Sequence, residues 1–508
     1  MPARRVAVSE TSIPALQPLP LNPRLYEINT RVWLRENGWD SPADIPDAVL
    51  DDWGSQFDII WLMGVWVPSD KGREVARAHE GLVEEIRQAL PDVTAADIVS
   101  SPYSIRDYRV SPLLGGDRAL ESFRARLHHR GLRLILDLVP NHMAIDHPWV
   151  TAHPDRFVQG TTEDISRSPQ NFFRLQSKTN VRIFAHGKDP YFDGWQDTVQ
   201  IDIFNPKMRR AMIELLIGLA GVCDGVRCDM AMLLLNDVFK RTWNTHVVEP
   251  PPVEFWKEAV AAVKMHRPDF MFLAEVYWDL EGCLQELGFD YTYDKKLYDS
   301  LRECAVDPVR RHLKSPLEFQ SRSARMIENH DEKRAANVFE GLRHQAAAMI
   351  TYSVSGLRFF HEGQMDGRRV KIPVQLARRV QEPQDDGVSL FYIRLLTELA
   401  EDVLLNGKWQ MLDPSPAWAD NASHEKMFGF WWQKNDDLRL VVVNYAPHPS
   451  QCYFRLPASR SFSGPTRFAD RLSARVYDRD ADDVRSRGMY FDMSAWDAHL
   501  FRVEPISR

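Results

Sequence analysis

Four short apolar runs in the sequence each carry a carboxylate residue at or near their end. These residues are Asp137 in LILDLVPNH, Asp229 in DGVRCD, Glu275 in FMFLAE and Asp331 in MIENHD. A single acidic residue after a strand is usually a helix cap or a turn former. Four in equivalent positions indicate a shared task, because residues that follow the strands of a parallel barrel meet at one end, where active sites lie.

Two of these carboxylates are expected to differ in protonation. Arg227 stands two residues before Asp229, so both side chains point to one face of a strand, and the guanidinium favours the ionised carboxylate that a nucleophile requires. Glu275 has apolar neighbours that would exclude water and raise its pKa, as a general acid requires. Retaining glycoside hydrolysis uses such a pair, with the two carboxyl groups about 5 to 5.5 Å apart. A buried Arg227–Asp229 ion pair without a catalytic task is the alternative.

Two histidines, His142 and His330, follow the same runs as Asp137 and Asp331. At the mouth of a barrel, we expect them to be neutral hydrogen-bond donors to sugar hydroxyls. A zinc site is the competing interpretation. The sequence contains no HExxH motif or comparable ligand spacing, so zinc is not expected.

A framework of parallel strands has to position these residues. Strand-like runs alternate with amphipathic helical patterns, which is typical of β–α–β units. Eight runs are expected to be strands, at 25–28, 57–62, 132–138, 222–228, 270–274, 288–293, 325–327 and 357–360. Helices are expected over 73–90, 208–220 and 254–265. Eight strands are the number that a closed (β/α)8 TIM barrel needs, so the sequence predicts this α/β fold.

Two stretches do not fit the alternation of strands and helices. Residues 143–205, after the third strand, are too long for a structureless loop and predict an inserted loop domain. After residue 400, runs at 427–433, 438–445, 451–456 and 499–503 predict a C-terminal all-β sandwich. The predicted domains are an N-terminal extension (1–23), the catalytic barrel (24–142 and 206–400), the inserted domain B (143–205) and the C-terminal sandwich (401–508).

The composition narrows the class of protein. The chain has 63 Lys and Arg against 71 Asp and Glu, a net charge of −8, which argues against a nucleic-acid binder. No window reaches about 18 consecutive apolar residues, and the first 21 residues lack the apolar run of a signal peptide. The five cysteines are scattered, as in proteins of a reducing compartment. We therefore expect a soluble cytoplasmic protein with no nucleic-acid or membrane partner, and the oligomeric state stays open.

At these residues the sequence resembles the α-amylase family of glycoside hydrolases, family thirteen. Four segments resemble the family's signatures in the family's order: DLVPNH at 137–142, GVRCD at 225–229, FLAEV at 272–276 and ENHD at 328–331. Supporting matches are SPYSIRDY at 101–108, QIDIFNP at 200–206 and SGLRFFHEGQ at 355–364. The resemblance covers roughly residues 24–400 and implies a barrel with a domain B and a β-sandwich domain C.

The resemblance also implies a role for each matching residue. Asp229 would be the nucleophile that forms a covalent glycosyl intermediate, and Glu275 would be the acid/base. Asp331 would bind ring hydroxyls and support the transition state. The implied substrate-binding residues are Tyr103, which would stack on a sugar, and His142, Arg227, His330 and Arg334. Asp137 and Asn141 would support the site.

The sequence departs from the family pattern at several positions. Met232 and Leu233 stand where many amylases carry a Lys-His pair used for the reducing-side sugar and for calcium. Asn141 remains as one calcium ligand, whereas a hard cation needs about six to eight oxygen ligands. We therefore expect no cofactor, with calcium as the alternative. Arg334 resembles the arginine that holds a terminal glucose in exo-acting glucosidases, but Ser100 stands where its acidic partner would be.

The leading interpretation is a retaining glycoside hydrolase that acts on α-glucosidic bonds of α-glucans or maltooligosaccharides. The alternative is an α-glucan or glucosyl transferase of the same fold, since both reactions use one covalent intermediate. A catalytically inactive carbohydrate-binding protein is the lesser alternative. The sequence does not separate α-1,4 from α-1,6 linkages, or endo from exo action. Four tryptophans are expected to stack on sugar rings: Trp66, Trp149, Trp195 and Trp278.

Overall fold

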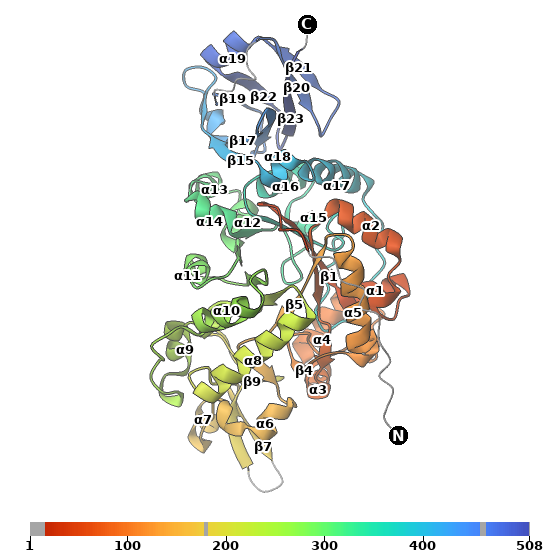
Figure 1. The fold of residues 1–508 in the computed structure, drawn as a ribbon, viewed down its shortest axis with the longest axis vertical. Coiled ribbons are helices and arrows are strands. Elements are labelled where there is room, and N and C mark those ends of the chain that lie inside the picture. The colour runs from red at the N-terminus through yellow and green to blue at the C-terminus, as the bar shows by residue number, and fades with distance from the viewer. Residues whose placement is uncertain (1–15, 177–180, 458–463, 507–508) are drawn as a thin grey trace, which may run out of the picture.

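The computed structural model describes residues 16–176, 181–457 and 464–506, and its centre is a closed barrel of eight strands (Figure 1). All neighbouring strands of the barrel are parallel. In spatial order they are β1 (Arg24–Asn29), β14 (Leu357–His361), β13 (Ser323–Arg325), β12 (Tyr291–Tyr293), β11 (Met271–Ala274), β10 (Gly225–Cys228), β5 (Arg133–Leu138) and β2 (Ile59–Met63). This closure confirms the predicted (β/α)8 TIM barrel.

Several predicted elements differ in their bounds. The helix α8 (Pro206–Val222) continues to Val222, so β10 begins only at Gly225. The helix expected over 73–90 is divided into α3 (Asp70–Ala78) and α4 (Glu80–Ala89), because His79 has an extended backbone and its ring Nδ1 accepts a hydrogen bond from the Leu82 amide. The seventh strand, β13, begins two residues before the expected run.

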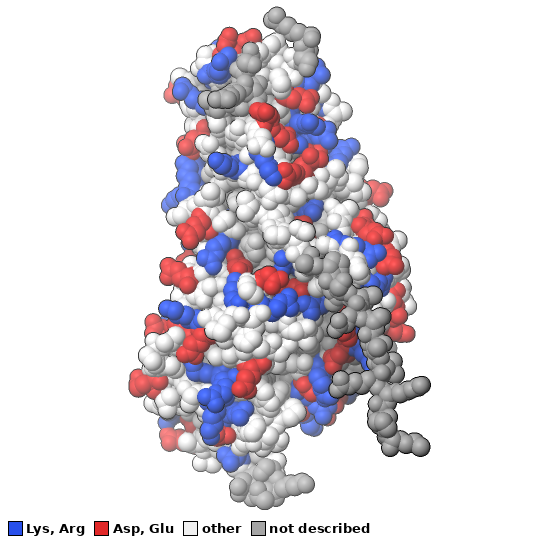
Figure 2. All heavy atoms as spheres, in the orientation of Figure 1, with Lys and Arg blue, Asp and Glu red and all other residues white. Residues whose placement is uncertain are grey.

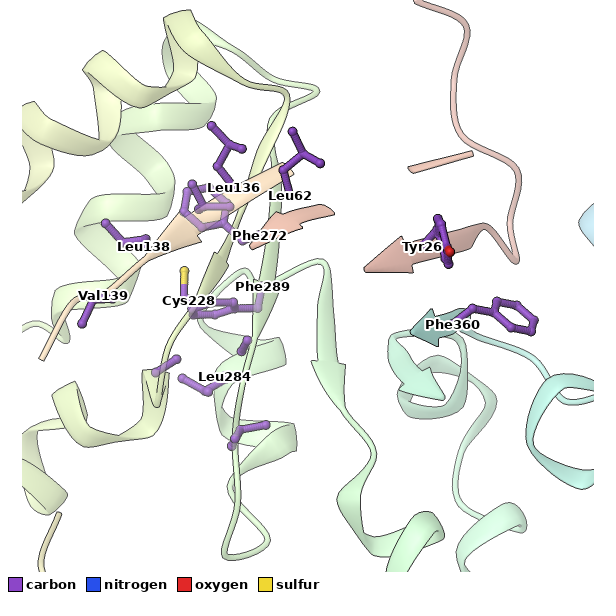
Figure 3. Close-up of a cluster of buried hydrophobic side chains, with 14 of the residues drawn as sticks. Tyr26, Leu62, Leu136, Leu138, Val139, Cys228, Phe272, Leu284, Phe289 and Phe360 are labelled. Carbon is purple, nitrogen blue, oxygen red and sulfur yellow. The ribbon is translucent and has the colours of Figure 1, made fainter. Parts of the chain in front are cut away.

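Alternate side chains of the barrel strands face the surrounding helices and the barrel interior. Outward-facing residues such as Leu62, Leu136, Phe272 and Phe360 lie in one large apolar cluster (Figure 3). That cluster also contains residues of α8, α10 (Phe255–His266), α16 (Leu342–Tyr352) and α17 (Asp386–Leu399). The barrel interior holds a separate cluster around Trp61. At the carboxyl ends of the strands, the side chains that face the barrel interior are charged.

The segment between β5 and α8 forms two small antiparallel sheets with short helices. β6 (His142–Ala144) pairs with β9 (Thr198–Gln200), and β7 (Phe172–Gln176) pairs with β8 (Val181–Ala185). The helices α6 (Pro148–Ala152) and α7 (Thr162–Arg167) lie between β6 and β7 in the chain. Figure 1 shows this segment at one end of the molecule, with the barrel in the middle.

The C-terminal region is built almost entirely of strands, as predicted. A six-stranded sheet has the order β15 (Lys408–Leu412), β17 (Met427–Lys434), β18 (Asp437–Asn444), β23 (Ala498–Pro505), β20 (Thr466–Asp470) and β21 (Val476–Arg479). A three-stranded sheet consists of β16 (Pro414–Pro416), β19 (Ser450–Phe454) and β22 (Met489–Met493). Apolar residues from both sheets share one buried cluster. The domain limits proposed from the sequence stay predictions, and most of the predicted extension, residues 1–15, lies outside the described residues.

The surface in Figure 2 carries acidic and basic side chains interspersed, without a wide basic area on the face in view. Within the described ranges, no helix combines the length and the apolar character that crossing a bilayer requires.

Candidate active site

A pocket of about 230 Å³ lies at the carboxyl ends of the barrel strands. Its walls include five residues predicted for the site: Tyr103, His142, Asp229, Glu275 and Asp331. A larger hollow of about 690 Å³ lies at the opposite end of the barrel, where the strands begin, and contains none of the predicted site residues. The smaller pocket is therefore the candidate active site, in agreement with the position of active sites in parallel barrels.

Arg227 is fully buried and connects two of the carboxylates that line this pocket, Asp229 and Glu275. Its Nη1 atom lies 2.7 Å from Asp229 Oδ1, and its Nη2 atom lies 2.7 Å from Glu275 Oε2. All three residues are buried. The expected Arg227–Asp229 contact is present, and the contact with Glu275 adds to it. The two carboxylates thus lie on either side of a single guanidinium group.

Aromatic rings enclose the Arg227 guanidinium. Its central carbon lies 5.3 Å from the ring centre of Trp61, 5.1 Å from that of Tyr103 and 5.6 Å from that of Tyr293. Arg227 Nε also donates a hydrogen bond of 3.2 Å to the Tyr293 hydroxyl. A desolvated cation between aromatic faces is held by cation–π attraction as well as by its two carboxylate partners. The guanidinium is therefore fixed in place before any substrate binds.

Asp229 ionises less readily than the neighbouring Arg227 leads one to expect from the sequence. Burial raises the pKa of Asp229 to about 7, while Arg227 acts to lower this pKa and the Glu275 charge acts to raise it. A carboxyl group with this pKa is partly ionised at neutral pH, so the nucleophilic form of Asp229 is present there.

Glu275 receives hydrogen bonds from two further donors. The Tyr277 hydroxyl donates to Glu275 Oε1 over 2.7 Å, and the Met230 amide donates to Oε2 over 2.7 Å. Met230 has φ +42°, a left-handed conformation that residues other than glycine rarely adopt. This turn directs the Met230 amide to Glu275. The apolar neighbours expected from the sequence are present, but donors surround the carboxylate itself.

His330 lies between two carboxylates, Glu27 and Asp331. Its Nδ1 is 2.5 Å from Glu27 Oε1, and its Nε2 is 3.0 Å from Asp331 Oδ2 and 2.6 Å from the Tyr103 hydroxyl. Burial acts to lower the pKa of His330, but the two carboxylates outweigh it and raise the pKa to about 10. The structure therefore corrects the neutral histidine expected from the sequence: the ring is an imidazolium.

Asp331 is the most accessible of the three predicted carboxylates of the pocket, with 47% of its side chain exposed. Its partial burial acts to raise its pKa, but the His330 charge and hydrogen bond hold the pKa well below its ordinary value. An ionised and accessible carboxylate of this kind is suited to accept hydrogen bonds from hydroxyl groups.

His142 is neutral, as the sequence predicted, because burial lowers its pKa to about 4. Its Nε2 donates a hydrogen bond of 3.2 Å to the Tyr103 carbonyl oxygen. The Trp195 ring, which also lines the pocket, lies 5.1 Å from the His142 ring. Donation to a sugar hydroxyl stays a prediction for His142, since its proton already has an acceptor in this structure.

Asp137 is fully buried and is hydrogen-bonded to strand β2 and to the residues that follow it. Its carboxylate accepts hydrogen bonds from the Trp61 indole over 3.1 Å and from the Gly64 amide over 2.7 Å, and its carbonyl oxygen accepts from the Trp66 indole over 2.7 Å. Burial raises the pKa of Asp137 to about 6. These contacts are those of a supporting residue. Trp66 itself is buried, with 4% exposed, so it does not offer a face to a sugar.

The surroundings of Asn141 do not fit a calcium ion. Its side-chain oxygen already accepts a hydrogen bond of 3.0 Å from the Gln200 amide, and its nitrogen points to the Lys188 carbonyl oxygen over 3.5 Å. Calcium needs about six to eight oxygen ligands. Within the part of the chain that the structure describes, no three His, Cys, Asp or Glu residues are grouped to hold a metal.

Arg334 is the predicted substrate-binding residue that the structure places elsewhere. It is 2% exposed and donates hydrogen bonds to Glu328 Oε1 over 2.6 Å, to His361 Nδ1 over 2.9 Å and to the Glu362 carbonyl oxygen over 2.8 Å. Burial among carboxylates, rather than contact with the pocket, explains its position. In this structure Arg334 is part of a buried ionic network.

Several residues of the site were not among the predictions. Glu27 contacts His330, Tyr293 and Trp61 enclose Arg227, and Asp197 and Gln375 line the pocket. One signal was available for Glu27, because it is a carboxylate within the otherwise apolar strand run RLYEIN. The others are aromatic or polar residues whose positions depend on contacts distant in sequence.

The fold and the pocket define a class: parallel (β/α)8-barrel proteins with a cluster of carboxylates at the carboxyl ends of the strands. The alpha amylase catalytic-domain family model matches residues 90–382, more than half of the chain. The chain therefore belongs to the α-amylase family, glycoside hydrolase family thirteen.

Individual relatives cover only part of the chain. Alpha-amylase 3 of Dictyoglomus thermophilum is 22% identical over 306 residues, which are 56% of this chain and 57% of that protein. The alpha-1,4-glucan:maltose-1-phosphate maltosyltransferase of Rhodospirillum rubrum is 26% identical over 280 residues, 53% of this chain and 33% of that protein. The match thus spans little more than half of one relative and a third of the other.

Solved structures resemble the whole chain in fold. The maltogenic α-amylase AmyB of Thermotoga neapolitana has a TM-score of 0.66 at 17% identity, covering 95% of this chain and 98% of its own. The α-amylase of Geobacillus thermoleovorans, solved with acarbose, has the same TM-score and identity and covers 97% and 100%. These similarities extend over the barrel and the C-terminal sheets.

Proposed function

We propose that this protein is a retaining glycoside hydrolase that cleaves α-glucosidic bonds of α-glucans or maltooligosaccharides. One observation carries the proposal: Arg227 contacts both Asp229 and Glu275, and these two carboxylates line a single pocket. The pair supplies a nucleophile and a proton donor for one bond. Family membership and the amylases among the relatives support the substrate class.

The proposed reaction has two steps. The Asp229 carboxylate attacks the anomeric carbon while Glu275 donates its proton to the bridging oxygen, so that the glycosidic bond breaks and a glycosyl ester forms. Glu275, now ionised, then takes a proton from water, whose oxygen attacks the same carbon and releases Asp229. Each step inverts the anomeric carbon once, so the product retains the α configuration.

The other pocket residues bind the sugar in this proposal. Asp331 accepts hydrogen bonds from ring hydroxyls and stabilises positive charge in the transition state. The neutral ring of His142 lines the pocket. The imidazolium of His330 contacts Asp331, and the Tyr103 ring lies beside His330 at a centroid distance of 5.4 Å. Arg227 contacts both Asp229 and Glu275 and so fixes the position of the nucleophile relative to the acid/base.

A glucan or glucosyl transferase is the second candidate, because a sugar hydroxyl can replace water in the second step. The relatives include a maltosyltransferase and the trehalose synthase of Pimelobacter, which is 26% identical over 208 residues. The proposal includes no cofactor and a cytoplasmic location. The location is supported by five cysteines that are all unpaired.

Product analysis tests this function. The protein is incubated with maltooligosaccharides, isomaltose, sucrose, trehalose and maltose 1-phosphate, and the products are identified by chromatography. Proton NMR follows the anomeric signal of the first product. We expect cleavage of a maltooligosaccharide with the α-anomer formed first; β-anomer formed first would rule out the retaining mechanism. Longer saccharides that dominate over cleavage products at millimolar acceptor would assign the transferase instead.

A further inference from the structure

Three separate segments of the chain supply a polar wall of the pocket. Ser101 and Ser104 precede β4 (Ile105–Val110), Asp197 precedes β9, and Gln375 lies in the loop between β14 and α17. All four line the pocket together with the predicted carboxylates. The two-step reaction uses none of these four side chains, and they are therefore candidates for selecting the substrate.

Hydrogen bonds join the three segments to one another. The Val99 amide donates to the Gln375 carbonyl oxygen over 2.8 Å, and the Ser104 hydroxyl donates to the Asp197 carbonyl oxygen over 3.0 Å. These contacts use main-chain oxygens, so the side chains of Asp197 and Gln375 are left to bind a ligand. A substrate chain cannot pass between the segments unless these hydrogen bonds break.

Among the described residues, Asp197 is the one carboxylate lining the pocket that has no cation beside it. Each of the other three contacts Arg227 or His330, whereas Asp197 forms no ion pair with any residue that the structure describes. Burial raises the pKa of Asp197, while its own backbone amide and the Ser104 hydroxyl act to lower it. A carboxyl group withdrawn from water without a cation needs hydrogen-bond partners, and sugar hydroxyls can supply them.

Gln375 provides donors on the same wall. Its main-chain oxygen is paired with Val99, but its side-chain amide has no hydrogen-bond partner within the described ranges. A side-chain amide has two N–H donors and one oxygen acceptor. Asp197 and Gln375 thus present an acceptor and a donor, which suits a sugar hydroxyl because a hydroxyl both donates and accepts.

The volume of the pocket limits how much of a saccharide it can enclose. It is about 230 Å³, below the roughly 300 to 1,000 Å³ of pockets that hold drug-sized ligands. Such a volume suits one sugar ring rather than a chain of several. Since Asp229, Glu275 and Asp331 line the same volume, the enclosed ring is the one whose glycosidic bond is attacked.

We propose that the pocket encloses only the sugar unit at the non-reducing end of a substrate, and that Asp197 and Gln375 bind the hydroxyl groups that a terminal unit alone carries. In an α-1,4-linked chain, the 4-oxygen of an internal unit is bonded to the next sugar, whereas the terminal unit has a free 4-hydroxyl. The protein therefore removes or transfers one sugar unit at a time from the chain end. This inference rests on the proposed function, because the roles of Asp229 and Glu275 define the bond that is cleaved.

The test compares maltopentaose with the same saccharide carrying a 4,6-O-ethylidene group on its non-reducing end. This group removes the free 4- and 6-hydroxyls of the terminal unit and leaves every glycosidic bond in place. We expect the first products from the free saccharide to differ from it by a single glucose unit. The kcat/KM for the blocked saccharide should be at least about a hundredfold lower, because a site built to bind a hydroxyl rejects a ligand that lacks it.

Two outcomes of this comparison are distinguishable failures. Comparable cleavage of the free and the blocked saccharide, or maltose and maltotriose as first products of the free one, would overturn the inference and leave the proposed function standing. Cleavage or transfer of neither saccharide would refute the proposed function, and the inference with it.

Variants test the two side chains. Asp197→Ala should lower kcat/KM for free maltopentaose about tenfold, the loss of one hydrogen bond to a charged group, and change kcat/KM for the blocked saccharide less than about twofold. Gln375→Ala should show a smaller loss in the same direction. Asp193→Ala is the matched control, because Asp193 is an exposed carboxylate of the same inserted segment, and it should change neither value.

Circular dichroism checks that each variant has the native fold, and Asp197→Asn, which keeps the shape of the side chain, replaces the alanine variant if that one does not fold. Equal losses on both saccharides would assign Asp197 a structural role only. Equal losses, or no loss on the free saccharide, would thus overturn its part in recognising the chain end.

Discussion

Glu27 Oε1 lies 2.5 Å from His330 Nδ1, although the two residues are 303 positions apart in the chain. Glu27 belongs to β1 and is fully buried, and His330 follows β13. With Asp331 on the other ring nitrogen, this contact keeps the imidazole charged. A buried carboxylate on strand β1 therefore contributes, with Asp331, to the charge of a histidine beside the pocket.

Glu27→Gln should lower kcat/KM at pH 8 by about tenfold, the loss of one hydrogen bond between charged groups. The folded-state pKa of His330 is raised to about 10 from an ordinary value of 6.5, so its contribution to stability is complete below about pH 6.5 and is lost as the pH rises toward 10. The melting temperature of the variant should thus depend less on pH between 7 and 10 than that of the wild type. Superimposable curves from differential scanning fluorimetry would contradict the role of Glu27.

Asp229→Asn should abolish turnover, because an amide cannot form the glycosyl ester. We expect a loss of at least about a thousandfold in kcat, as when other nucleophiles are removed. Circular dichroism should show an unchanged fold. Activity within tenfold of the wild type would remove Asp229 from the nucleophile role.

The same variant should be more stable than the wild type at neutral and alkaline pH. The folded-state pKa of Asp229 is raised to about 7, above an unfolded value of about 3.9, so its ionisation opposes folding as the pH rises between these values. The difference in melting temperature between Asp229→Asn and the wild type should grow from pH 4 to pH 7 and then level off. A constant difference would show that Asp229 ionises as easily in the folded state as in the unfolded state.

Arg334→Ala should destabilise the fold by about 3 to 5 kcal/mol, since it leaves the buried Glu328 carboxylate without its partner. The exposed pair of Arg467 and Asp478 offers the control, and Arg467→Ala should cost no more than about 1 kcal/mol. Denaturant titration followed by tryptophan fluorescence measures both. A stable Arg334→Ala protein whose only defect is a changed product length would place Arg334 at the substrate.

Removal of metal ions by a chelator tests whether calcium binds at Asn141. Addition of EDTA should leave the melting temperature and the activity unchanged, because removing an ion that is not bound cannot shift the folding equilibrium. A fall of several degrees that added calcium reverses would reveal a site built from other ligands.

Much of the fold and the core of the site can be predicted from local patterns. Alternating runs and turns predict the eight barrel strands, and strand periodicity puts Arg227 beside Asp229, two residues away. The strand periodicity does not predict the pKa of Asp229. Burial raises this pKa despite Arg227, and burial depends on all the residues that surround the carboxylate. Similarly, the motif around Asp331 includes His330, but part of the rise in the pKa of His330 comes from Glu27, which reaches the ring from another strand.

The sequence by itself determined the parallel barrel, the C-terminal sheets and the carboxylates Asp229, Glu275 and Asp331, because each depends on residues close together in the chain. Only the tertiary structure decided that Arg227 contacts two of these carboxylates, that Arg334 is enclosed away from the pocket, and that Trp278 meets Tyr191. These relationships join side chains from separate strands and loops. Closure of the barrel and packing of its loops bring them together, and no local pattern encodes such distances.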